Sequence, residues 1–135
     1  MFIDTSVVVA ILAKAADAAD LVAKISDAKY LTTSGLVRLE AVMRLSTMLD
    51  IPPADADIAF DRLIQTARIA VIPITDDIAK LSVAAFERYG KGRGHSARLN
   101  LADCLSYAAA KSRRERLLFK GDDFGRTDVN DDIED

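Results

Sequence analysis

The chain has little cysteine, little histidine and no long apolar run, and each shortage excludes a class of protein. One of its 135 residues is cysteine, Cys104, so no internal disulfide can form, which fits a reducing cytoplasm. No segment approaches the roughly 20 apolar residues that span a bilayer, and the first residues lack a signal-peptide pattern. We therefore expect a cytoplasmic protein that makes no contact with a membrane.

An excess of positive charge is also missing. The formal net charge is −3, which disfavours a general coat protein for nucleic acid, because such proteins are usually basic. A nuclease is not excluded, since divalent metal ions bound by carboxylates add positive charge where the acids sit. Half of the residues are hydrophobic, and the length is that of one domain. We expect residues 1–135 to form a single domain with a disordered acidic tail at about 130–135.

Short apolar runs alternate with segments of helical periodicity along the chain. A buried strand at the N-terminus ends at Asp4, and a helix begins at Thr5 or Ser6. Ser34, Thr75 and Asn100 are typical residues to cap the start of later helices. This alternation predicts an α/β fold with a parallel sheet covered on both faces. Further strands are expected at 30–33, 68–72, 116–119 and 127–129, and further helices at 15–26, 35–49, 54–66, 75–89 and 100–111.

Four carboxylates stand where a charge is costly. Asp4 ends an apolar strand, Glu40 lies on a helix among apolar neighbours, Asp103 is in the first turn of an alanine-rich helix, and Asp123 follows a strand across a glycine turn. Burying several such groups together requires cations. Oxygen ligands without histidine or cysteine suit Mg²⁺, or Mn²⁺ in its place, better than Zn²⁺.

Each of these acids also has an ordinary structural explanation, and the periodicity does not decide between the two. A carboxylate can cap a helix, pair with a cation one turn away, favour a helix dipole or form a turn. These alternatives apply in that order to Asp4, Glu40 with Arg44, Asp103 after Asn100, and Asp122 or Asp123. His95, the only histidine, is expected to be an idle surface residue without partners, and Cys104 a small core residue.

Taken together, the acids and their surroundings resemble the motifs of PIN-domain ribonucleases of the VapC toxin type. The match begins with Phe-Ile-Asp-Thr-Ser at residues 2–6 and continues, in the family's order, at 33–40, 98–108 and 118–128. The resemblance covers the whole chain, and the last two motifs are the most specific. One departure lies in the stretch 94–98, where Ser96 replaces a proline of the family pattern, which should loosen that loop without touching an acid.

The resemblance implies a three-layer sandwich whose central, mainly parallel sheet has four to five strands flanked by helices. It implies that Asp4, Glu40, Asp103 and Asp123 are catalytic residues that bind Mg²⁺, and that RNA is hydrolysed to a 5′-phosphate and a 3′-hydroxyl. Further candidates are accessory groups beside the acids and cations that contact RNA phosphates. The accessory candidates are Thr5, Ser6 and Asp122, although Ser6 can equally serve as a helix cap alone. The candidate cations are Lys91, Arg93, Arg98, Arg113, Arg114, Arg116 and Lys120, of which Arg98 and Lys120 are preferred. For Arg113, Arg114 and Arg116 a solvated helix end is the favoured alternative, because cations suit that terminus.

The family pattern also implies partners. A VapB-type antitoxin is expected to cover the site, with the apolar helices 15–26 and 35–49 as its groove, and DNA is contacted only through that antitoxin. A homodimer, or a larger toxin–antitoxin assembly, is expected as well. Two other classes compete with the nuclease: a catalytically silent PIN scaffold that acts as a binding or regulatory module with an antitoxin, and a phosphatase or receiver domain that uses Asp4 as a phosphoryl acceptor. The second lacks the further acids that such proteins need near the acceptor.

Overall fold

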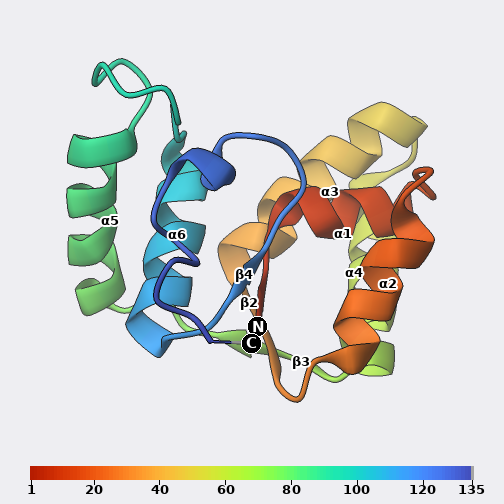
Figure 1. Cartoon of the computed structure of the whole chain (residues 1–135). Coiled ribbons are helices and arrows are strands. Elements are labelled where there is room, and N and C mark those ends of the chain that lie inside the picture. The colour runs from red at the N-terminus through yellow and green to blue at the C-terminus, as the bar shows by residue number, and fades with distance from the viewer. Residues whose placement is uncertain (135) are drawn as a thin grey trace.

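A central sheet of four parallel strands organises the computed structural model, which describes residues 1–134 (Figure 1). The strands lie in the order β3-β2-β1-β4. Within the described residues no helix is long and apolar enough to cross a bilayer. The strands are β1 Phe2–Ile3, β2 Leu31–Ser34, β3 Ile69–Ile72 and β4 Leu117–Leu118, and the helices are α1 Thr5–Leu12, α2 Ala18–Asp27, α3 Gly35–Leu49, α4 Pro53–Ala67, α5 Asp76–Tyr89, α6 Leu101–Arg113 and the short 3₁₀ turn η1 Phe124–Arg126.

The helices form two layers, one on each side of the sheet. In Figure 1, α5 and α6 lie together on one side and α1 to α4 on the other. The chain therefore leaves β1 towards one face and returns to β4 from the other, which creates a switch point between these neighbouring strands. In parallel sheets of this kind, ligands bind outside the carboxyl ends of the strands at such a point. The predicted α/β sandwich with a central parallel sheet is confirmed, with four strands among residues 1–134.

Side-chain caps start the helices where the sequence predicts them. Ser34 Oγ accepts a hydrogen bond from Val37 N, and Thr75 Oγ1 accepts one from Ile78 N. Asn100 caps α6 through a reciprocal pair of bonds with Asp103. Each cap satisfies a backbone N–H that the first helical turn leaves without a partner. Three helix starts are thereby fixed by local chemistry, whereas α2 begins at Ala18 and not at residue 15.

The brief strand predicted at 127–129 is wrong. Residues 127–129 form bends and a turn, and the hydrogen bonds that a further strand would make to β4 are made by a side chain instead. The carboxamide of Asn130 accepts from Leu117 N at 2.8 Å and donates to Leu117 O at 3.0 Å, so it satisfies the free edge of β4. Asp128 turns towards α6, where it accepts a hydrogen bond from Tyr107 Oη. Most of the predicted tail at 130–135 is exposed, and its last residue, Asp135, lies outside the described residues.

Helix periodicity predicts buried faces that the packing only partly uses. On α4 Phe60 is buried, but Ile58 is 49% exposed. On α5 Ile78 and Ala85 are buried, whereas Leu81 and Phe86 are half exposed. Phe60 is covered by the Arg38 guanidinium, which lies 4.7 Å from its ring centre and pairs with Asp57 and Asp61. A salt-bridged cation thus covers part of the core.

Candidate metal centre and its surroundings

A pocket of 210 Å³ lies at the carboxyl ends of β1 and β4, between the start of α6 and the middle of α3. All four predicted acids line it, together with Asp122 and Ser6. The sheet brings these groups together from positions up to 119 residues apart, which the sequence left as a hypothesis. Their roles as metal ligands or catalytic groups stay predictions.

Asp4 is 4% exposed and held by one of its two oxygens. Its Oδ2 accepts hydrogen bonds from Ser6 N at 3.0 Å and from Ser6 Oγ at 2.6 Å. The same Ser6 hydroxyl accepts a bond from Lys120 N at 2.9 Å, which ties α1 to the loop after β4. Across residues 1–134 no group donates to Asp4 Oδ1. Asp4 therefore caps α1 and keeps one oxygen for another partner.

Thr5 behaves differently from Ser6, although both are predicted accessory groups. Its side chain is buried, and Thr5 Oγ1 has no hydrogen-bond partner among the described residues. It does not bond an oxygen of Asp4. Of the two hydroxyls, only that of Ser6 lines the acidic pocket and orients an acid.

Asp103 shares this division between its two oxygens. Oδ2 accepts from Asn100 N at 3.0 Å, while Asn100 Oδ1 accepts from Asp103 N at 2.8 Å. Burial, helped by the charges of Asp4, Glu40 and Asp123, raises the pKa of Asp103 to about 6, although the hydrogen bond from the Asn100 backbone lowers it. The other acids thus repel this carboxylate, which is the electrostatic condition that a bound cation relieves.

Glu40 is half-buried on α3, and Arg44 stands one turn further along the same helix. The alternative in which these two form an ion pair is wrong for the described chain, since no ion pair joins them. Arg44 is exposed and lines the acidic pocket, as does Asn100. The sequence prediction missed both as pocket residues, although the i+4 spacing from Glu40 placed Arg44 on the right face.

Asp122 and Asp123 are both exposed in the loop that follows β4, and both line the pocket. The charge of Asp123 contributes to the raised pKa of Asp103. Asp123 therefore lies where its charge acts on Asp103, which favours it over Asp122 as the fourth acid of the group.

The donor atoms suit a hard cation, but their spacing does not preform a site. Throughout residues 1–134, no three acidic, histidine or cysteine side chains are close enough to hold a metal ion together. Asp4 and Asp103 each orient one oxygen through a hydrogen bond and leave the other oxygen without a donor in the described chain. Oxygen donors of this kind, with room for water, fit Mg²⁺ or Mn²⁺.

The predicted phosphate-contacting cations lie in several separate places. Lys120 lines the acidic pocket, with its Nζ 3.0 Å from Asp17 Oδ1. Arg98 is exposed outside that pocket, and Lys91 lines a separate apolar groove. Arg113, Arg114 and Arg116 lie at the opposite end of the sheet. Most of these cations therefore do not surround the acids.

Cys104 and His95 were predicted to have no part in catalysis, and the structure places both. Cys104 is buried, as predicted. The prediction that His95 is idle is wrong: its Nδ1 accepts a hydrogen bond from Ala97 N at 2.9 Å, and its ring meets the Tyr89 ring edge-on with centres 4.8 Å apart. His95 therefore organises the loop before α6, which contains Gly90, Gly92 and Gly94.

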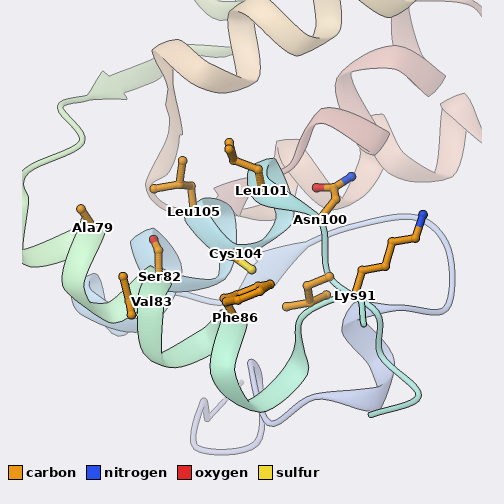
Figure 2. Close-up of a pocket in the computed structure, with 10 residues that line it drawn as sticks. Ala79, Ser82, Val83, Phe86, Lys91, Asn100, Leu101, Cys104 and Leu105 are labelled. Atoms are coloured by element: carbon orange, nitrogen blue, oxygen red, sulfur yellow. The ribbon is translucent and has the colours of Figure 1, made fainter. Parts of the chain in front are cut away.

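An apolar groove of 500 Å³ lies between α5 and α6, beside the acidic pocket (Figure 2). Val83 and Phe86 of α5 line this groove together with Leu101, Cys104 and Leu105 of α6, all labelled in Figure 2. Val83 and Leu101 are 67% and 73% exposed, which is unusual for large apolar side chains gathered in one place. Asn100 lines both the groove and the acidic pocket, so the two features are adjacent.

Comparison with known proteins identifies the family to which this chain is similar. The model of the PIN domain matches residues 1–130. A VapC ribonuclease of Mycobacterium bovis and the ribonuclease VapC28 of Mycobacterium tuberculosis are each 43% identical over 129 residues, covering 96% of this chain and 95% of theirs. A VapC ribonuclease of Rhizobium meliloti is 37% identical, over 95% of this chain and 98% of its own.

A solved structure agrees in fold. Mycobacterium tuberculosis VapC20, a toxin that cleaves the sarcin–ricin loop, superposes with a TM-score of 0.71 over 92% of each chain. Its sequence identity is 20%, so this likeness concerns the fold alone. The family match and the whole-length relatives agree with the motifs at residues 2–6, 33–40, 98–108 and 118–128. The chain therefore belongs to the PIN-domain family and, within it, to the VapC ribonucleases.

Proposed function

We propose that this protein is a metal-dependent endoribonuclease toxin that hydrolyses RNA to a 5′-phosphate and a 3′-hydroxyl in the cytoplasm. The observation that carries the proposal is the convergence of Asp4, Glu40, Asp103 and Asp123 on one pocket at the switch point of the sheet. Relatives that match over nearly the whole chain are ribonucleases, which supports RNA as the substrate.

Asp4, Asp103, Glu40 and Asp123 would hold Mg²⁺, with Mn²⁺ as a substitute. When bound, such an ion lowers the pKa of water and neutralises charge on phosphate oxygens. Ser6 and Asn100 hold Asp4 and Asp103 by one oxygen each, so that the second oxygen faces other partners. Lys120 and Arg44 line the same pocket and provide positive charge for the RNA backbone.

The direct test is cleavage of a mixed RNA pool by protein freed of any antitoxin. Cleavage is expected with Mg²⁺ or Mn²⁺ and is expected to stop in EDTA, because the acids alone repel phosphate. Mapping of the new ends would show 5′-phosphates. If neither metal supports cleavage while the protein still binds an antitoxin, the silent-scaffold alternative replaces this proposal.

Removal of the Ser6 hydroxyl should weaken activity without unfolding the protein. In Ser6→Ala, Asp4 Oδ2 loses one of its two donors and the Lys120 amide loses its acceptor. Groups that orient a metal-binding carboxylate in this way typically contribute about 10- to 100-fold, so we expect a rate loss in that range. Ser6→Thr, which keeps the hydroxyl, serves as the matched control in the same cleavage assay. Equal rates for Ser6→Ala and wild type would contradict this positioning role.

A VapB-type antitoxin is the proposed inhibitor, and it would be the only route by which the toxin contacts DNA. Exposed apolar side chains follow α3 beside Glu40, among them Leu39 at 56% and Met43 at 61%. On α2, Val22 is also exposed. An apolar segment laid along this surface would reach the acidic pocket. Met43→Glu is expected to reduce copurification with the antitoxin, whereas Arg62→Glu on the exposed side of α4 is not.

The apolar groove between α5 and α6 is the proposed contact between two copies of the chain, alone or within a larger toxin–antitoxin assembly (Figure 2). Val83→Glu places a charge in this contact and should shift the mass in light scattering from dimer to monomer. Lys80→Glu, on an exposed position of the same helix, is the control. A monomeric wild type, or a dimer that tolerates Val83→Glu, would contradict this assignment.

A further inference from the structure

A second hollow, of 1,210 Å³, lies at the opposite end of the sheet from the acids. It is lined by the residues that precede all four strands, among them Met1 before β1, Tyr30 before β2 and Arg68 before β3. Its lining carries positive charge although the whole chain is acidic. The positive groups are the N-terminal amine, Lys29, Arg68, Arg113, Arg114 and Arg116, against the two carboxylates of Glu115 and Glu134.

The carboxylate of Glu115 does not neutralise this hollow, because it is already engaged. It accepts hydrogen bonds from Thr32 Oγ1 and from Arg113 Nε, and it lies 3.7 Å from the N-terminal amine. Lys29, Arg68 and Arg114 have no acidic partner among residues 1–134. Three cations therefore face the hollow with their charge uncompensated by the described chain.

Two of these cations lie at positions where the backbone conformation favours glycine. Arg68 follows α4 with φ of 55°, and Arg114 follows α6 with φ of 52°. Glycine is the favoured residue in this left-handed conformation at the end of a helix, because a side chain there is strained. The helix dipole favours a cation near this end but does not require it at the strained residue. Both arginines are thus placed against a local preference, and both line the same hollow.

An exposed aromatic ring completes the surface. Tyr30 is 72% exposed, and Lys29 Nζ lies 5.6 Å from the centre of its ring. Cations that track phosphates beside a ring on which a base can stack are the combination that binds single-stranded nucleic acid. We propose that this basic hollow is a second RNA-binding surface, in which the arginines contact phosphates and Tyr30 stacks a base. The choice of RNA rests on the proposed function, whereas the preference for phosphate rests on the charges alone.

The test is binding of a fluorescently labelled single-stranded RNA of about 20 nucleotides to the full chain, measured by anisotropy in EDTA at low salt. The double variant Arg68→Gly/Arg114→Gly should weaken binding about tenfold and reduce the salt dependence by about two phosphate contacts. Tyr30→Ala should weaken binding by a similar factor. Lys24→Ala/Arg62→Ala removes the same charge from exposed positions of α2 and α4 and should change the affinity less than about twofold.

Urea unfolding separates binding from stability. Glycine suits both positions, so the double variant is expected to be at least as stable as wild type while it binds RNA more weakly. Equal binding by wild type and the double variant, or equal loss in the Lys24→Ala/Arg62→Ala control, would overturn the proposal. A double variant that is less stable than wild type would overturn it as well, because the arginines would then serve the fold. Since no metal is present, failed cleavage would count against the proposed function and leave this result intact.

Discussion

Asp4→Asn is expected to reduce metal-dependent RNA cleavage by about 10³-fold or more while the fold is kept. Asparagine has the same shape, and its carbonyl oxygen can still accept the bonds that Ser6 N and Ser6 Oγ donate to Asp4 Oδ2. What is lost is the negative charge at the buried end of β1. A loss of this size corresponds to about 4 kcal/mol of transition-state stabilisation, which is reasonable for one ligand of a catalytic cation.

Initial rates on a defined RNA, compared at saturating Mg²⁺, measure this effect. Asp77→Asn, an exposed acid in the first turn of α5, is the control and should stay within about twofold of wild type, because a remote surface charge is screened. Thermal unfolding followed by circular dichroism should be the same for Asp4→Asn as for wild type. Substantial cleavage by Asp4→Asn would remove Asp4 from the catalytic group and return it to a helix cap.

Asp103→Asn should abolish cleavage to a similar extent and yet stabilise the metal-free protein above pH 6. The pKa of Asp103 is raised to about 6 by burial and by neighbouring carboxylates, so the folded state holds this proton more tightly than the unfolded state does. The group's contribution is therefore fully favourable below the unfolded pKa and is lost as pH rises through 6. Asparagine keeps the bond to Asn100 N without the charge, and we expect a gain of about 1–2 kcal/mol at pH 7.5 after allowance for partial exposure.

Urea unfolding in EDTA at pH 4.5 and pH 7.5 tests this result. The advantage of Asp103→Asn over wild type should be present at pH 7.5 and should shrink towards pH 4.5, where wild-type Asp103 is protonated. Added Mg²⁺ should stabilise wild type more than the variant, because a ligand that binds only the folded state raises its stability. If the variant is less stable at both values of pH, Asp103 serves mainly as a capping residue and the repulsion among the acids is unimportant.

The two explanations of the acids, as helix caps and as site residues, are compatible in this structure. The alternatives for Asp4 and Asp103 were a cap and a stabilised helix start, and both carboxylates do make those local bonds through Oδ2. A carboxylate has two oxygens, so one can orient the side chain while the other faces the pocket. Glu40 is the exception, because its expected local partner Arg44 forms no ion pair with it within the described chain.

The sequence alone determined the elements whose causes are local. Ser34, Thr75 and Asn100 cap helices because their side chains reach a backbone N–H three residues away, and the short apolar run Phe2–Ile3 forms a buried strand. The parallel arrangement, with Asp4 at the end of β1, follows from the alternation of strands and helices. The family could be identified from the sequence because each of its motifs is a short stretch of the chain.

Only the tertiary structure decided which side chains meet across long separations. It left Ile58 and Phe86 exposed, replaced the expected strand at 127–129 by the Asn130 bonds to Leu117, and placed Arg114 at the far end of the sheet from the acids. Periodicity defines a face of a helix, but the neighbour that covers this face is chosen by the packing of the whole chain. The acidic pocket and the basic hollow are therefore properties of the two ends of the assembled sheet, and no single segment contains either of them.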